Sequence, residues 1–164
     1  MKSIFMASLC MICMADAAAQ DTQAVDGFFR VCMGALGDQD SGEAIARKLG
    51  FVPASAEQKQ ALLREGAAGA AYTGEKMAIV LERDGLCTVY AHTNDQAALQ
   101  EQLKKALPPP STLFKVSEET MNRDPDVTGT VYHLTLPTRP FADWIFSAYK
   151  RPGKYNIAIS MQLR

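Results

Sequence analysis

The chain is poor in the residues that build most metal and redox sites. It contains only two histidines, His92 and His133, and four cysteines. Common metal sites need several such ligands that the fold brings together, and a thiol redox motif needs two cysteines close in sequence. A zinc site would have to unite both histidines with Asp95 or another carboxylate. We therefore predict no metal and no cofactor.

Neither sign of charge is in excess. Seventeen Lys and Arg residues stand against 18 Asp and Glu, which leaves a net charge of −1. Proteins that bind nucleic acid gather basic residues on one face, often with aromatic residues that stack on bases. Here the basic residues near the C-terminus lack that alternation, and we interpret them as solvated charges that discourage pairing at sheet edges. These residues are Arg139, Lys150, Arg151, Lys154 and Arg164. We expect no nucleic-acid partner.

No apolar run reaches the roughly 20 residues that a membrane-spanning helix needs. The apolar stretch from Ile4 to Met14 follows Lys2 and precedes Ala17-Ala18-Ala19, the order of a cleavable secretory signal. We predict a signal peptide over residues 1–19 and a periplasmic or secreted protein without stable membrane insertion after cleavage. The alternatives are a membrane anchor, or a lipid on Cys10 or Cys13, although both cysteines lie inside the apolar core.

Residues 20–164 suit a single domain with one core. The pattern of apolar residues predicts three short helices, then a hairpin, a longer helix and further strands. The helices are expected through Phe28–Leu36, from Ser41 to Gly50, from Ser55 to Arg64 and over 93–107, and the strands over 77–81, 86–91, 112–118, 128–136, 142–150 and 155–163. This order predicts an α+β fold, with about five to seven antiparallel strands and the N-terminal and mid-chain helices packed on them.

Asp84-Gly85 is a strong signal for a two-residue hairpin turn. With that turn, Val80 lies opposite Val89. Cys87 then shares a face with Ala78, Val80, Val89 and Ala91. The helix that carries Cys32 is expected to cross this face if the two cysteines are bonded.

Cys32 and Cys87 are the only cysteines left after removal of the signal. Two cysteines in an exported chain most often pair with each other. A reactive thiol or a metal-binding pair are the alternatives, but the wide spacing does not favour a redox motif. We therefore predict a structural disulfide.

Three short motifs carry a resemblance to a known family. They are Phe28-Phe29-Arg30-Val31-Cys32, Leu49-Gly50-Phe51-Val52-Pro53 and Asp84-Gly85-Leu86-Cys87-Thr88-Val89. With the predicted signal, they resemble a family of small uncharacterised periplasmic or secreted proteins from Proteobacteria. The resemblance covers most of the mature chain and implies a bacterial envelope location and the Cys32–Cys87 bond. It implies no activity.

No motif predicts catalysis or phosphate binding. The serines lack a nucleophile signature. The segment Gly66–Ala71 lacks the Lys-Ser/Thr ending of a phosphate loop, and we interpret it as a flexible connection into the sheet. Asp124-Pro125-Asp126 has the composition of a turn rather than the spacing of a calcium loop.

Aromatic residues concentrate near the C-terminus at Phe141, Trp144, Phe146 and Tyr149, with Tyr132 and Tyr155 nearby. Some of them, Tyr149, Trp144 and Tyr132, are candidate ligand contacts in a groove. The alternative is a core, since aromatic residues favour strands and bury large areas. On a strand, Trp144, Phe146 and Ala148 share one face and suit the core, while Tyr149 lies on the other and is the better candidate for exposure.

These observations favour an exported, non-enzymatic protein that binds a protein partner or a small ligand in the cell envelope. An inhibitor of, or an immunity factor against, an envelope hydrolase fits the same description. A structural component of an envelope complex is another alternative, and it would show an exposed apolar patch. A small hydrolase-like enzyme would use His92 and His133, with Asp95 and Asp143.

Overall fold

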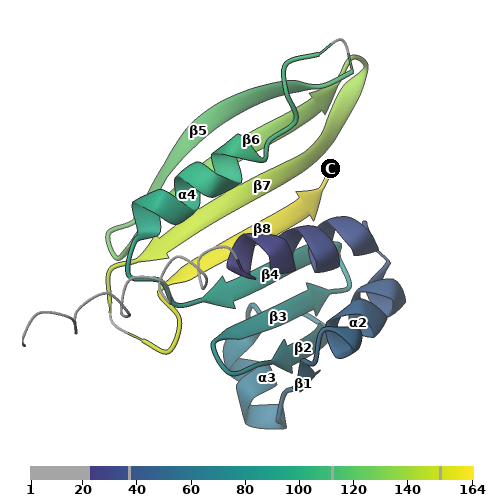
Figure 1. Ribbon diagram of the computed structural model, residues 1–164, viewed down its shortest axis with the longest axis vertical. Helices are drawn as coiled ribbons and strands as arrows, with labels where there is room; N and C mark the ends of the chain where they lie inside the picture. Colours follow the sequence, from purple (N-terminus) through teal and green to yellow (C-terminus); the bar gives the residue numbers. More distant parts are fainter. Residues whose placement is uncertain (1–22, 37, 112, 152) are drawn as a thin grey trace, which may run out of the picture.

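The computed structural model describes residues 23–36, 38–111, 113–151 and 153–164 (Figure 1). The predicted signal segment 1–19, including Cys10 and Cys13, lies outside the described residues. Within the described ranges, no helix has both the length and the apolar character needed to cross a membrane.

Eight antiparallel strands form one sheet, with helices packed on it, so the predicted α+β class is confirmed. The strands are β1 (Val52–Pro53), β2 (Gly69–Thr73), β3 (Met77–Glu82), β4 (Leu86–Ala91), β5 (Lys115–Asp124), β6 (Val127–Leu136), β7 (Arg139–Tyr149) and β8 (Ile157–Leu163). Their order across the sheet is β1-β2-β3-β4-β8-β7-β6-β5. The sheet is larger than the sequence predicts because β1 and β2 carry weak strand signals.

Strand β2 corrects the interpretation of Gly66–Ala71 as a flexible connection. Its first residues are Gly69, Ala70 and Ala71, and both residue types have low strand propensity. The glycine is required by packing, because a Cβ at Gly69 would collide with the backbone of Leu81 and Glu82 in β3. A small residue that permits close approach of two strands is therefore easily mistaken for a loop residue.

The sheet consists of two halves that meet at its centre. The chain forms β1 to β4 in sequence and crosses through α4 (Gln96–Lys105) to the far edge. It then returns through β5, β6 and β7 to β8, which pairs with β4. Figure 1 shows the two halves side by side, with the yellow β8 next to the teal β4.

One face of the sheet is covered by helices. The first helix spans residues 23–35, includes the π-helical turns η1 (Phe28–Met33), and lies across β4 and β8. Helix α2 (Gln39–Lys48) packs on η1 and β3, and α4 reaches β6, where Gln100 Nε2 donates to Thr130 Oγ1 at 2.8 Å. The side chains buried beneath these helices include Cys87, Val89, Ile159, Met161, Trp144, Phe146, Tyr132 and Leu134. They form the core.

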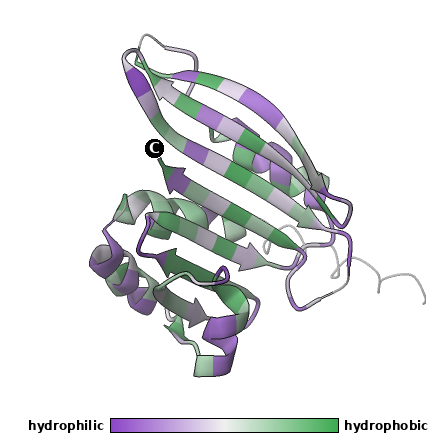
Figure 2. Ribbon diagram, turned by 180° about the vertical axis from the view of Figure 1, so that it is seen from behind, coloured by the Kyte–Doolittle hydropathy of each residue, from purple (hydrophilic) through white to green (hydrophobic). Residues whose placement is uncertain are grey.

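The opposite face differs between the two halves. Helix α3 (Ala56–Leu62) reaches it beside β4, where Tyr90 Oη donates to the Leu62 carbonyl at 3.3 Å. Over β5 to β8, Figure 2 shows the strands with no described helix in front of them. Alternation along β7 places Asp143, Ser147 and Tyr149 on this open face.

The predicted disulfide between Cys32 and Cys87 is present. It joins η1 to β4, and both residues are buried. The first helix therefore crosses the face that carries Val89 and Ala91, as the sequence predicts. With both cysteines in this bond, neither is a free thiol or a metal ligand.

The predicted hairpin register is wrong by one residue. Cys87 lies opposite Leu81, and Val89 lies opposite Ile79 rather than Val80. Only Gly85 has a positive φ in this turn, at +88°, whereas the expected turn needs two such residues. The loop is instead a three-residue one, with Gly85 N–H donating to the Glu82 carbonyl at 3.1 Å. Cys87 consequently shares its face with Ile79 and Leu81, not with Ala78 and Val80.

The predicted start of α3 is confirmed, and the predicted start of α2 is corrected. The capping box of α3 is present, since Ser55 Oγ accepts from Gln58 N–H and Gln58 Oε1 accepts from Ser55 N–H. Helix α2 begins earlier than predicted because Asp38, not Ser41, caps it. Ser41 Oγ instead donates to Asp38 Oδ2 at 2.6 Å. Gly37, which follows the predicted first helix, lies outside the described residues.

Candidate functional site

The aromatic residues predicted as ligand contacts do not form a surface groove. Trp144 and Tyr132 are 1 % and 0 % exposed and lie under the first helix and α4, which corrects their assignment as contacts and confirms the core alternative for Trp144. Tyr149 is on the open face, as expected, but is only half-exposed. Burial raises the pKa of its hydroxyl.

The two histidines border different hollows. His92 follows β4 and is exposed beside Glu75, Lys76 and Lys154, whereas His133 lies on β6 beside Asp143. Asp95, proposed to act with them, caps α4 by accepting from Ala98 N–H at 2.9 Å. The described residues contain no group of three His, Cys, Asp or Glu side chains arranged to hold a metal. The two histidines therefore line different hollows.

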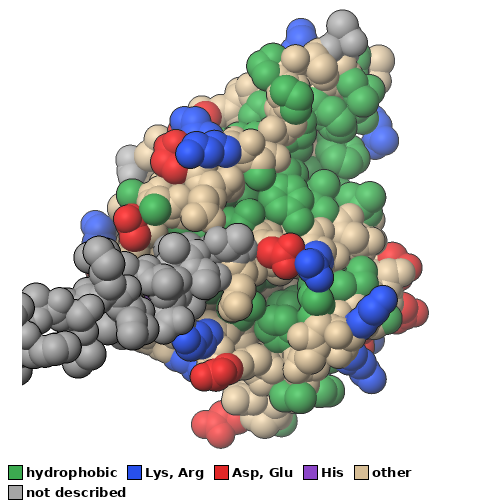
Figure 3. Space-filling model, viewed as in Figure 1, with side chains coloured by type: hydrophobic (Ala, Val, Ile, Leu, Met, Phe, Trp, Pro, Cys, Tyr) green, Lys and Arg blue, Asp and Glu red, His purple; other side chains and the backbone are tan. Residues whose placement is uncertain are grey.

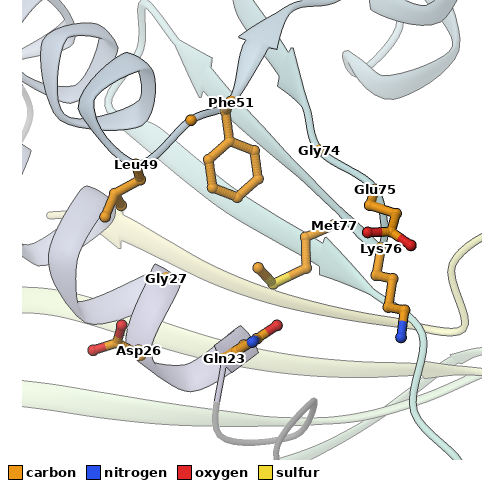
Figure 4. A pocket seen from close by; sticks show the side chains of 10 residues that line it. Gln23, Asp26, Gly27, Leu49, Phe51, Gly74, Glu75, Lys76 and Met77 are labelled. Carbon is orange, nitrogen blue, oxygen red and sulfur yellow. The ribbon is translucent and has the colours of Figure 1, made fainter.

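One hollow lies between the first helix, the end of α2 and the β2–β3 turn (Figure 4). Its volume is about 480 Å³, within the range of about 300–1,000 Å³ usual for ligand pockets. We call it the apolar hollow, because Leu49, Phe51 and Met77 supply its hydrophobic wall.

Local backbone geometry directs this wall inward. Leu49 ends α2, and Gly50 then takes φ +87°, a conformation that turns the chain sharply. Phe51 follows and is 9 % exposed, with its ring against Gly74. In Figure 4 the Phe51 ring, from the loop after α2, and the Met77 thioether, from the start of β3, point into the same space.

The rim of the apolar hollow is polar. Gln23 and Asp26 come from the first turns of the helix, and Glu75 and Lys76 come from the β2–β3 turn. Asp26 is engaged by Arg30, one helical turn later, at 2.9 Å. Lys76 therefore supplies the positive charge on this rim.

A second, smaller hollow adjoins the first across the β2–β3 turn. It has a volume of about 250 Å³ and is lined by Glu75, Lys76, His92 and Lys154. We call it the basic hollow, since three of its four lining residues have basic side chains. The Lys154 ammonium also lies 5.2 Å from the centre of the Tyr155 ring, a cation–π distance that favours this position. Glu75 and Lys76 border both hollows.

A larger hollow of about 550 Å³ lies beside α3. Its walls come from that one helix and the loop after it, and its arginine, Arg64, is engaged by Glu82 and Asp84. Its apolar lining is limited to Ala56, Leu63 and Ala67, and its second cation, Lys59, lies on the exposed surface of α3.

Hydrophobic side chains also gather on the helical face, as Figure 3 shows. The partly buried ones near the ends of β5 and β7 include Phe114 and Phe141, whose ring centres are 5.4 Å apart, and Leu113 beside them is 59 % exposed. We call these residues the apolar patch. Large exposed groups of apolar side chains are typical of contact surfaces between proteins, and here Leu113 is the exposed member.

The sequence does not predict that the residues of the two hollows lie together. Lys76, His92 and Lys154 come from three separate turns, and nothing in their spacing indicates that they meet. Leu49-Gly50-Phe51 carries the only local signal, an apolar pair around a turn-forming glycine. Comparison of the chain with known protein families, curated proteins and solved structures found no match.

Proposed function

We propose that this protein is exported to the cell envelope and there binds a small amphipathic anion, without catalysing a reaction. The observation that carries the proposal is the position of Lys76, which borders both the apolar hollow and the basic hollow. A ligand with an alkyl or aryl tail and an anionic head, such as a medium-chain carboxylate, matches this arrangement.

The tail is assigned to the wall formed by Leu49, Phe51 and Met77. Each buried methylene group contributes about 0.8 kcal/mol, so a tail that buries about six gains roughly 5 kcal/mol before the entropy cost of binding. Once that cost is subtracted and the contribution of the head is added, a net gain of about 4–8 kcal/mol corresponds to millimolar to micromolar binding.

The head is assigned to the side of the β2–β3 turn that carries Lys76, His92 and Lys154. The charged groups there are exposed, so each contact is screened by water and salt. Among the described residues that line the basic hollow, Glu75 is the carboxylate, and its charge disfavours an anion beside it and favours one beside Lys154.

Isothermal titration calorimetry with decanoate tests the proposal. We expect binding in the micromolar to millimolar range, weaker binding of hexanoate, and a loss of several-fold in affinity in Lys76→Glu. Lys59→Glu, on the exposed surface of α3, is the matched control and is expected to bind like the wild type. Absence of heat with decanoate, or equal affinities for Lys76→Glu and Lys59→Glu, would contradict the proposal.

Export is supported by the buried disulfide, since such bonds form and persist in oxidising compartments. The proposed cleavage after residue 19 is tested separately, by the intact mass of the protein recovered from a periplasmic extract. Recovery of the full-length mass from the cytoplasm alone would refute export. It would not bear on the proposed ligand.

The apolar patch favours a second candidate function, a protein partner such as an envelope hydrolase that this chain inhibits. Pull-downs from periplasmic extract with the wild type and with Phe114→Ser test it. One stoichiometric protein that is lost with the variant supports this candidate, and equal recovery by both proteins counts against it.

A further inference from the structure

His133 lies between two carboxylates on the open face of the sheet. Its Nδ1 is 2.8 Å from Asp143 Oδ1 in β7, and its Nε2 is 3.1 Å from Glu119 Oε2 in β5. The ring therefore connects the two strands on either side of β6, which share no backbone pairing with each other. Because the carboxylates face opposite ring nitrogens, they do not converge on a point where a metal ion would sit.

The two carboxylates differ in how firmly they are held. Asp143 is 5 % exposed, and its Oδ2 accepts from Arg164 Nε at 2.7 Å. Glu119 is exposed on β5, with 61 % of its side chain accessible. Thr135, Leu134 and Pro140 complete the surroundings and carry no charge. The charged groups that face the ring are thus Asp143, Glu119 and, through Asp143, Arg164.

Elementary imidazole chemistry determines what this arrangement requires. A neutral imidazole has one N–H donor and one lone pair, so it satisfies one carboxylate and repels the other. Only the imidazolium donates to both. With Arg164, the protonated cluster has two positive and two negative charges, and loss of the proton leaves one negative charge uncompensated.

We propose that His133 is a pH-dependent cross-link that fastens the edge strand β5 to the interior of the sheet. In its protonated form it donates from Nδ1 to Asp143 and from Nε2 to Glu119. When the Nε2 proton is released to solvent, Nδ1–H stays on the buried Asp143, and Glu119 moves away from the exposed lone pair into water. The link between β5 and β7 is then broken.

The electrostatics of the site agree with this assignment. The hydrogen bond to Asp143 has the largest effect and raises the pKa of His133, burial lowers it, and the hydrogen bond to Glu119 raises it again, with a net increase above the ordinary value of 6.5. The change of state therefore falls at a higher pH than that of an unperturbed histidine.

The effect is expected at β5 because this strand lies at an edge of the sheet. It pairs only with β6, and its residues 115–120 are all exposed. Edge strands with exposed backbone hydrogen bonds open more readily than central ones. Loss of the Glu119 contact therefore loosens β5 while the core stays closed.

Hydrogen–deuterium exchange of the peptide covering β5, measured from pH 5.5 to 8.5 and normalised to the exchange of the unstructured sequence, tests the proposal. We expect the protection of β5 to fall by about two- to fivefold as His133 loses its proton, the range of exposed ion pairs. Glu119→Gln is expected to remove this pH dependence, since the amide donates to the neutral ring and accepts from the charged one.

Glu118→Gln is the matched control. Glu118 is the neighbouring carboxylate of the same strand but lies on the other face, where it pairs with Lys104 at 3.0 Å. This variant should retain the pH dependence of the wild type. Constant protection of β5 across this pH range in the wild type, or equal behaviour of the two variants, would overturn the proposal.

Long-range ¹H–¹⁵N spectra give a second measurement that does not depend on exchange. In a His92→Gln background, His133 is the only histidine, and both its ring nitrogens should show the shifts of an imidazolium at pH 6. A neutral ring at this pH in the folded protein would also overturn the proposal.

Discussion

The ring of Phe28 meets the indole of Trp144 edge-on, with the two ring centres 5.3 Å apart and the planes at 79°. Phe28 belongs to η1 and Trp144 to β7, so this contact joins the first helix to the C-terminal half of the sheet. The disulfide joins the same helix to β4 in the other half. The helix therefore restrains both halves at once.

Phe28→Ala should lower the free energy of unfolding by about 3–5 kcal/mol, because it removes a fully buried aromatic ring and leaves a cavity. Urea denaturation measures this loss. Phe29→Ala is the matched control, since Phe29 also contacts Trp144 but is only half-buried, and it should lose less. Equal losses in the two variants would show that Phe28 has no special part in the core.

Cys32→Ala and Cys87→Ala should each lower stability by about 2–5 kcal/mol, the usual effect of removing a native disulfide from a small domain. The double variant should lose about as much as either single one, because all three lack the same bond. Chemical denaturation compares them with the wild type. A reducing agent that leaves the wild-type midpoint unchanged would contradict this expectation.

Tyr72→Phe should lower the free energy of unfolding. It should also make that free energy depend less on pH in the acidic range. Tyr72 Oη donates to Glu43 at 2.5 Å, and this bond is the largest cause that lowers the pKa of Glu43 below its ordinary value of 4.5. A lowered carboxyl pKa contributes stability that is present above pH 4.5 and is lost as the pH falls through the lower, folded-state value. Removing a hydrogen bond to a charged group costs about 1.5–3 kcal/mol.

Thermal unfolding of Tyr72→Phe between pH 2.5 and 7 measures both effects. Glu57→Gln is a control on an exposed carboxyl in α3 and should leave the acid dependence as it is in the wild type. A Tyr72→Phe profile parallel to that of the wild type would show that the bond does not couple folding to pH.

Gly74→Ala should weaken decanoate binding several-fold with little change in stability. The added methyl group would lie 3.1 Å from Cε1 of Phe51 and push its ring into the apolar hollow. Calorimetry and circular dichroism measure the two properties. Unchanged affinity together with an intact fold would place the tail elsewhere.

Local patterns account for most of the elements. The alternation of Ile157, Ile159 and Met161 with small or polar neighbours predicts β8, and the Ser55 capping box predicts the start of α3, because both signals depend on residues close in sequence. Strand order does not follow, since the pairing of β4 with β8 depends on residues far apart in the chain. The hairpin register was missed because Asp84-Gly85 fits both a two-residue and a three-residue loop.

The candidate site is harder to predict from the sequence than the fold. His133 and Asp143 were separate candidates in the sequence, and only the β6–β7 register places them opposite each other. Glu119 joins them from a third strand. The hollows likewise depend on how three turns meet, and tertiary packing alone decides that.

The pairing of β4 with β8 has a consequence for how the protein forms. The two halves of the sheet share this one ladder, and β8 is the final strand in the order of the chain. Each half contains only neighbouring antiparallel pairs, which close quickly, whereas joining β4 to β8 requires a long loop to close first. We therefore expect the halves to gain structure early and the complete sheet to appear in the slowest step of folding. Until then β4 presents an unpaired edge that is open to association with other chains.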